Sequence, residues 1–450
     1  MNTDFVTYPF ISALKERRSR RFCLGMSLDG GPLTYQSRYA PVPLSETEEA
    51  LMAFAACGVT GCAVADLAYN GDGGGNIMAG LIGRTIASGD GIQTVNLVTI
   101  RDSGAYLYRR PQEMPAAQIP ELARLSDRNE FVQAAQQMRV PIVNQRVRTL
   151  SEPIFNINAN RWSVHSPGTT YFLPVNELTF MYINGLLEIL NECTGVYILD
   201  ERAGFRPAGL AKFAKSKGGH LSDNPAEGKV ATMALVERLV TEFVTVEQGM
   251  MLQNLGLMAQ TLGLGGFPNF ANHDFAWFEA LGFRMEKMPA SKYLGIRGLT
   301  AFGMRLLGKD NEVPLPLGLE RNGEPLLKSY APPYFPSMRA AVQAVVDFKF
   351  GRNGVFRDPQ SSKPWKDANI AQNISGLSDQ TIAATTAYCE YVWNRYRRFP
   401  AHMPPFRTVL GFQAGHLDLE FYDKFYPAGA VGETQRTADS FIEKVLRPGT

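Results

Sequence analysis

The sequence predicts a protein built from both helices and strands. One observation is a long apolar segment, Glu247–Leu262, which has the residue types of a buried helix. Another is a hairpin pattern, in which a strand at Thr94–Ile100 leads through a turn at Asp102–Gly104 to a second strand at Tyr106–Arg109. Helical and strand periodicities therefore both occur in the chain.

The central helix is expected to be buried on nearly all sides, because methionine and leucine leave it almost no polar face. Gly263 should stop the helix and Pro268 should prevent a restart. The run is shorter than the roughly 20 apolar residues of a membrane span, so no membrane partner is expected. An ordinary core helix is the alternative to a functional one. The apolar residues are Met250, Met251, Leu252, Leu255, Leu257, Met258 and Leu262.

A basic segment, Arg17-Arg18-Ser19-Arg20-Arg21-Phe22, follows a short helix at Ile11–Glu16. A run of charges is usually a solvated face. Arginine forks with a hydroxyl can also grip a phosphate bidentately, which makes an anion clamp the second interpretation.

A small-residue loop, Ala87–Gly91, precedes the strand at Thr94–Ile100. Glycine adds no side chain, so the backbone of such a loop can approach a flat ligand closely. Tight turns use the same residues, and both interpretations remain open.

Charge and composition exclude several classes. The 45 basic and 43 acidic residues give a formal charge of +2, so no nucleic-acid partner is expected. The five cysteines are scattered, which is typical of reduced thiols in a cytoplasmic protein. The N-terminus has no signal-peptide pattern, so neither a leader nor an anchor is expected. The five histidines form no zinc motif, and no metal site is expected.

Other elements follow from local patterns. Ser45 and Glu48 form a capping box for a helix at Pro43–Thr60. The composition shifts at the proline-rich stretch Ala331–Pro336, which marks a linker or a wrapping arm. The predicted helices beyond these are Asn129–Met138, Leu178–Leu190, Val230–Val240, Ala276–Phe283, Met338–Lys349 and Thr381–Arg398, and a further strand is predicted at Val313–Leu319.

These pieces, in this order, resemble the nitroreductase superfamily of FMN-dependent oxidoreductases. The basic segment is similar to the family's Arg-Arg-Ser-x-Arg-x-Phe motif, with the aromatic one place early. Ala87–Thr94 takes the place of a Pro-Ser-x-x-x-x-Gln-Pro loop, and Gln253–Leu264 matches the core of the family's central helix. The loop and Tyr106–Tyr108 are also similar to the dehydrogenases that oxidise azolines.

The resemblance implies an α+β fold, with a mixed sheet flanked by helices around a buried central helix. It covers residues 1–330 as an FMN-binding domain with an insertion at about 150–230. Residues 331–450 would be a C-terminal extension, either a wrapping arm or a helical module. The resemblance also implies a homodimer, with central helices packed together and FMN at the interface.

Carried over by position, the resemblance implies a set of site residues. The basic segment would hold the FMN phosphate and ribityl chain, the loop would lie along the isoalloxazine, and the segment after the central helix would offer a backbone amide to flavin N5. A late basic residue would complete the phosphate site. These residues are Arg17, Arg18, Ser19 and Arg21; Ser88, Gly89 and Gln93; Pro268, Asn269 and Phe270; and Lys328. No catalytic side chain is named, because the cofactor carries the chemistry.

The function implied is that of an FMN-dependent oxidoreductase. NADH or NADPH would act as a transient reductant, and a small molecule or peptide would accept the hydride. Relatives carry an acid and then a glycine where this chain has Phe270 and Ala271. Two alternatives therefore stay open: a catalytically silent binding protein of the same fold, and a specialised flavin dehydrogenase that does not use NAD(P)H.

Overall fold

The fold is organised around a seven-stranded sheet in the order β12-β17-β8-β5-β6-β7, with β16 also paired to β8. The computed structural model describes residues 3–69, 77–150, 158–270, 272–361 and 363–438. The strands of this sheet are β5 (Val95–Arg101), β6 (Gly104–Tyr108), β7 (Arg139–Val143), β8 (Thr170–Glu177), β12 (Gly265–Asn269), β16 (Phe406–Arg407) and β17 (Gly411–Gly415). The predicted combination of helices and strands is confirmed.

Every pair in this sheet is antiparallel. This differs from the mixed sheet that the resemblance implied. A tight hairpin joins β5 to β6, whereas helices lie in the connections from β6 to β7 and from β8 to β12. Parallel pairing occurs instead between β9 (Tyr197–Asp200) and β11 (Val230–Thr232), in a separate three-stranded sheet that includes β10 (Arg206–Pro207).

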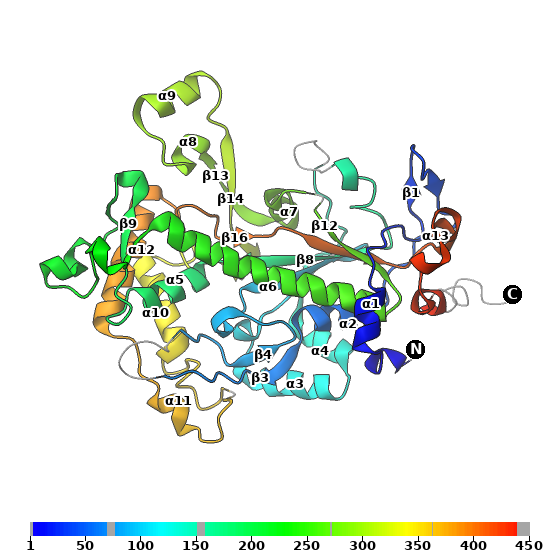
Figure 1. Cartoon of the computed structure of the whole chain (residues 1–450), viewed down its shortest axis with the longest axis horizontal. Helices are drawn as coiled ribbons and strands as arrows, with labels where there is room; N and C mark the ends of the chain where they lie inside the picture. Colours follow the sequence, from blue (N-terminus) through cyan, green and yellow to red (C-terminus); the bar gives the residue numbers. More distant parts are fainter. Residues whose placement is uncertain (1–2, 70–76, 151–157, 271, 362, 439–450) are drawn as a thin grey trace.

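One long helix, α6 (Met233–Thr261), crosses the molecule in front of the sheet (Figure 1). Its N-cap Thr232 accepts a hydrogen bond from the Leu235 amide, and Gly263 follows it with a φ of +73°. The predicted central helix therefore exists, but it begins fourteen residues earlier than expected and absorbs most of the helix expected at residues 230–240. Val230–Thr232 are strand instead, because they pair with β9.

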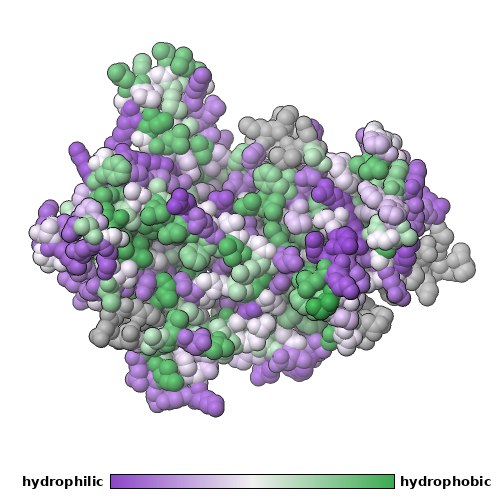
Figure 2. All heavy atoms as spheres, viewed as in Figure 1, coloured by the Kyte–Doolittle hydropathy of each residue, from purple (hydrophilic) through white to green (hydrophobic). Residues whose placement is uncertain are grey.

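Of the apolar residues predicted to bury the helix at Glu247–Leu262, only Met250 is exposed, while Met251, Leu252 and Leu255 are buried. The first half of α6, which was not predicted as part of this helix, is open on one side. Apolar residues recur along one face of α6 at spacings of three and four, and they are 38–56% exposed. They are Leu235, Leu239, Phe243, Val246 and Met250, and we call them the α6 stripe. Figure 2 shows hydrophobic residues at the surface along the path of α6. The opposite face packs on α2 (Glu46–Cys57), whose capping box is present.

A second hydrophobic core forms where α5 (Thr179–Ile189) meets α10 (Met338–Phe350) and α12 (Asp379–Tyr396). Met233, Val236, Val240 and Val244 bring the first half of α6 into the same core. Elements after residue 330 therefore pack directly on elements before it, and β16 and β17 belong to the main sheet.

A smaller sheet of β13 (Phe283–Pro289), β14 (Glu312–Arg321) and β15 (Glu324–Lys328) carries an arm that stands out from the body (Figure 1). The arm consists of α8 (Ala290–Tyr293) and α9 (Gly298–Leu306) between β13 and β14. The remaining elements are α1 (Phe10–Glu16), β1 (Ser27–Leu28), β2 (Tyr35–Gln36), β3 (Val59–Cys62), β4 (Ile82–Arg84), α3 (Ile119–Asp127), α4 (Phe131–Met138), α7 (Asp274–Leu281), α11 (Asn369–Asn373) and α13 (Leu419–Phe425).

Within the described residues, no helix has the combined length and apolarity to cross a membrane. The same part of the chain brings no three histidine, cysteine, aspartate or glutamate side chains together as ligands for a metal ion.

Candidate functional site

The basic segment runs from the end of α1 to the edge of β12, where Arg20 forms a bridge with Gly266. Arg20 itself is buried and structural. Its guanidinium donates to the carbonyl of Ala430 at 2.8 Å, to Oε1 of Gln260 at 2.9 Å and to the carbonyl of Glu16 at 3.3 Å. Burial lowers the pKa of Arg20, and the neighbouring positive charges of Arg17 and Arg18 act in the same direction.

The other three arginines face outward or lie at the surface. The Arg21 guanidinium lies 4.7 Å from the centre of the Phe267 ring, while the Arg18 guanidinium donates to the carbonyls of Lys15 and Arg17. Arg17 lies against Gly256 of α6, and Ser19 is exposed. In the part of the chain that the structure describes, none of these three arginines forms an ion pair with an acid. Their positive charge is therefore not neutralised by the protein.

The segment after the central helix lies beside the basic segment. It forms β12, paired with β17, and Pro268 is exposed there directly after Phe267. The side chain of Asn269 is buried and donates to Gln413 at 2.9 Å, while its carbonyl accepts a hydrogen bond from the Tyr171 hydroxyl. Phe270 is 40% exposed, and Ala271 lies outside the described residues. The structure thus brings two of the predicted contact segments together.

The Ser88 loop is held by a buried carboxylate of α6 that the sequence analysis does not single out. Glu247 accepts hydrogen bonds from the hydroxyl of Ser88, from the hydroxyl of Thr94 at 2.5 Å and from the amide of Val95 at 3.1 Å. The Ser88 hydroxyl also accepts from the Gln93 amide at 2.7 Å, and the Gln93 side chain donates to the carbonyl of Ile82. The side chains of Ser88 and Gln93 are therefore used to hold the loop, and Gly89 is exposed and adds no side chain of its own.

The role of Glu247 has a signal in the sequence. The predicted helix begins at Glu247, a position where an exposed acid is ordinary. A helix that begins at Met233 puts it mid-helix among apolar residues, where a buried carboxylate needs hydrogen-bond partners. The pair Glu247-Gln248 in an otherwise apolar helix therefore indicates that these side chains form hydrogen bonds inside the protein.

The basic segment and the Ser88 loop lie on opposite sides of the α6 stripe. Arg17 contacts Gly256 and the loop contacts Glu247, nine positions earlier on the same helix. Nine residues correspond to about 13 Å and about two and a half helical turns. The two sets therefore face away from each other around the helix, with the exposed apolar stripe between them.

Lys328 does not join this arrangement. Arg20 pairs with Gly266 of β12, Gly266 with Ala414 of β17, and Ala414 with Thr170, the first residue of β8. Arg20 therefore lies at the start of β8. Lys328 ends β15, and two residues later the Tyr330 amide donates to Thr179, just beyond the other end of β8. Eight residues of strand span about 25 Å, so Lys328 lies far from the basic segment.

A buried lysine packs beneath the Ser88 loop. Lys349 of α10 donates to Oδ1 of Asn184 at 2.7 Å, and burial lowers its pKa to about 7 against the opposing effect of Glu188 and Asp90. Burial also raises the pKa of Asp90 to about 6, with the positive charge of Lys349 acting against the shift. Asp90 has a φ of +59°, an uncommon backbone conformation for a residue with a side chain.

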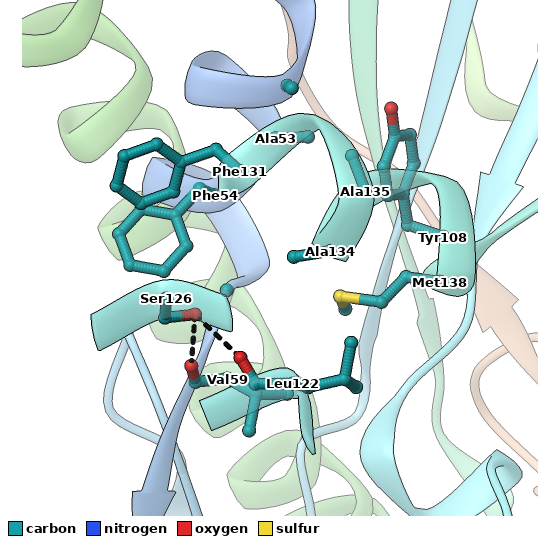
Figure 3. Close-up of a pocket in the computed structure, with 12 residues that line it drawn as sticks. Ala53, Phe54, Val59, Tyr108, Leu122, Ser126, Phe131, Ala134, Ala135 and Met138 are labelled. Carbon is teal, nitrogen blue, oxygen red and sulfur yellow. Dashed lines mark hydrogen bonds between the residues drawn. The ribbon is translucent and has the colours of Figure 1, made fainter. Parts of the chain in front are cut away.

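The gap between α2, α3 and α4 is not a ligand site. Its volume is about 10 Å³, which is near the minimum for one water molecule, and its walls are almost entirely apolar (Figure 3). The hydroxyl of Ser126 points along its edge and donates to the carbonyls of Val59 and Leu122. This space is a packing defect of the core.

No protein-family model matches the chain, and no curated protein matches it. One similar solved structure is described as a "putative nitroreductase" from Ralstonia eutropha JMP134. It is 13% identical to this chain, the match covers 61% of this chain and 76% of that one, and the TM-score is 0.29. A similarity at this TM-score carries no argument for fold or activity.

Proposed function

We propose that this chain is an FMN-dependent oxidoreductase that acts as a homodimer. The observation that carries the proposal is the set of guanidiniums of Arg17, Arg18 and Arg21, which form no ion pair within the described residues. Arg17 lies against Gly256 of the central helix, and Arg21 lies over Phe267 of β12. Arginine is suited to phosphate because its fork makes charge-assisted, bidentate hydrogen bonds. The sequence resemblance at residues 253–264 supports the same family.

The donor set fits FMN at its phosphate end. Three arginines supply the charge, and Ser19 adds an exposed hydroxyl. The Ser88 loop of the same chain faces away from these arginines around α6, so in the proposed dimer the ring would meet the Gly89 backbone of the other subunit. The hydroxyl of Ser88 and the amide nitrogen of Gln93 are already hydrogen-bonded within the protein. Lys328 is left out of the proposed site, since it lies at the far end of β8.

Bound FMN would supply hydride transfer between NADH or NADPH and a small-molecule or peptide acceptor. Arg18 and Arg21 would stabilise negative charge on the bound group. Glu247 would position the Ser88 loop. Phe243 of the α6 stripe lies next to Gly89, so a second subunit docked on the stripe would exclude water from the loop.

A second candidate is a binding protein of the same fold without the reaction. The observation that favours it is that the hydroxyl of Ser88 and the amide nitrogen of Gln93 are hydrogen-bonded within the protein, together with Phe270 in place of the relatives' acid. A specialised dehydrogenase that does not use NAD(P)H is the third class. Visible absorbance separates the three. A yellow protein that NADH or NADPH bleaches supports the reductase, and a yellow protein inert to both supports the dehydrogenase. A protein that added FMN cannot colour contradicts the proposal.

The matched test of the phosphate site is the double variant Arg17→Ala with Arg21→Ala. We expect FMN affinity to fall by about 10-fold or more, because each lost charged hydrogen bond is worth roughly 1.5–3 kcal/mol. Arg352→Ala, an exposed arginine outside this site, is the control and should leave affinity unchanged. Equal flavin retention in the double variant would reject the assignment of these arginines.

A further inference from the structure

The arm of α8 and α9 is fixed firmly at its base. The Arg398 guanidinium lies 3.7 Å from the centre of the Tyr293 ring and donates to the Tyr293 carbonyl at 2.5 Å, and Arg202 donates to the same carbonyl at 3.1 Å. Asp310, which follows α9, joins the two ends of the arm by accepting hydrogen bonds from the amide and hydroxyl of Ser291 in α8, at 2.6 and 2.7 Å. The arm therefore has a defined position relative to α12.

An open cleft of about 350 Å³ lies between this arm and the end of α12. Small-molecule sites have volumes of roughly 300–1,000 Å³, so the cleft is large enough for a small ligand. Among the described residues that line it, four carry a positive charge and none carries a negative charge. The four are Lys292, Arg297, Arg305 and Arg395.

Two of these charges are balanced from outside the cleft. Arg305 pairs with Asp310 at 3.1 Å, and Arg395 pairs with buried Asp200 at 3.0 Å. Lys292 and Arg297 form no ion pair within the described ranges. The cleft is therefore left with two cations that an anionic ligand could neutralise.

The N-terminus of α9 borders the same cleft. Its N-cap, Arg297, makes no side-chain capping hydrogen bond, and Gly298 and Ala301 of its first turn line the space. The first amides of a helix lack partners within the helix, and its dipole favours negative charge there. This feature points to an anion independently of the side-chain charges.

The remaining wall is apolar or aromatic. Phe302 is 64% exposed beside the cleft, and Ile296 and the buried ring of Tyr396 complete the wall. A ligand that only carried charge would leave this surface uncovered. Figure 2 shows that hydrophobic residues also cover the tip of the arm.

We propose that this cleft binds a small amphipathic anion, in which a phosphate or carboxylate is joined to a ring-bearing apolar group. Lys292, Arg297 and the first amides of α9 bind the charged group, and Phe302 contacts the ring. The site is separate from the proposed flavin site. The cleft lies near Glu237 of α6, because the Tyr293 hydroxyl donates to the carbonyl of His402 and the backbone amide of His402 donates to the Glu237 carboxylate. Glu237 and Gly256 are nineteen positions apart, about 28 Å of helix.

The probe for this proposal is phenyl phosphate, titrated into the full-length protein by calorimetry. We expect saturable binding, with inorganic phosphate and phenol each at least about 10-fold weaker because each makes only half of the contacts. The double variant Lys292→Gln with Arg297→Gln should weaken phenyl phosphate by about 10-fold or more. Phe302→Ala should weaken phenyl phosphate and leave inorganic phosphate unchanged.

The matched control carries Lys309→Gln and Arg352→Gln, which remove two exposed charges outside the cleft, one of them next to α9. It should bind the probe like the unmodified chain. Since FMN is itself an aromatic phosphate, the Arg17→Ala, Arg21→Ala variant is titrated as well, and its binding should be unchanged. Absence of saturable binding, equal binding by the Lys292→Gln, Arg297→Gln variant, or loss of binding in the Arg17→Ala, Arg21→Ala variant would each overturn the cleft assignment.

Discussion

The carboxylate of Glu247, in the middle of α6, accepts a hydrogen bond of 2.5 Å from the hydroxyl of Thr94, at the start of β5. The other carboxylate oxygen accepts from Ser88, so one side chain ties the central helix to the Ser88 loop and to the main sheet. Because Glu247 is only 4% exposed, these contacts are shielded from water. The position of the loop thus depends on a residue of the helix.

Replacing Glu247 by alanine should destabilise the protein and loosen the loop. The change leaves the buried Thr94 hydroxyl and Val95 amide without their acceptor, at a cost of about 3 kcal/mol in the free energy of unfolding. The midpoint of urea unfolding should fall, and hydrogen exchange should quicken at residues 88–95. Glu242→Ala is the control, because the Glu242 side chain is 63% exposed and pairs with exposed Arg238, and it should shift stability by less than about 1 kcal/mol. Unchanged exchange in the loop would contradict the tether.

The arginines of the basic segment should differ sharply in their effect on stability. Arg20→Ala removes three donated hydrogen bonds and leaves the buried Gln260 amide oxygen and the Ala430 carbonyl without Arg20 as donor, so we expect a loss of about 2–3 kcal/mol. Arg18→Ala removes an exposed side chain and should change stability by about 0.5 kcal/mol or less. Thermal unfolding of the two variants side by side measures the difference. Equal destabilisation would show that the burial of Arg20 has no energetic consequence.

A negative charge in the α6 stripe should prevent the proposed dimer. Phe243→Glu places a carboxylate where the second subunit would bury an apolar ring, and the residue is 56% exposed in the single chain, so folding should be retained. We expect sedimentation to change from dimer to monomer, with normal helix content by circular dichroism. Gln118→Glu adds the same charge at an exposed position on another surface and should remain dimeric. A Phe243→Glu variant that sediments like the unmodified chain would exclude the stripe as the interface.

The buried amine of Lys349 should make stability depend on pH. Its pKa is lowered from 10.5 to about 7 by burial, so between these values the unfolded chain holds a proton that the folded chain has released. Stability contributed by this group therefore rises with pH from about 7 to about 10. The free energy of unfolding of the unmodified chain, minus that of Lys349→Met, should increase by up to about 1.4 kcal/mol per pH unit.

Buried tyrosines with raised pKa values act in the opposite direction above pH 10, but they are common to both proteins and cancel in this difference. A difference that stays constant between pH 7 and pH 10 would mean that Lys349 keeps its ordinary proton affinity in the folded state.

Local patterns predicted much of the secondary structure. The β5–β6 hairpin, the capping box of α2 and the helical part of α10 and α12 all depend on residues within one or two turns of each other, and they are confirmed. Helix boundaries were less accurate, and α9 was not predicted. The single start of α6 was missed because its first half packs into a different core from its second half.

The candidate site could be predicted only in part from the sequence. The proximity of the basic segment to Phe267 follows the predicted order of motifs, but the internal use of Ser88 and Gln93 depends on Glu247, which lies about 150 positions away along the chain. Lys328 was predicted as a site residue from its position in the order of the family's motifs. Its distance from the arginines depends on the register of β8 with β17 and β12, which the sequence does not show.

The sequence by itself determined the type of most helices and strands, and which short segments carry charge or glycine, because these properties arise from neighbouring residues. Only the tertiary structure decided that Arg20 is buried while Arg21 is exposed, that an apolar stripe of α6 stays open, and that Lys292 and Arg297 share a cleft with Phe302. The physical reason is that burial and ion pairing depend on which distant segments of the chain come into contact. Local periodicity carries no information about these tertiary contacts.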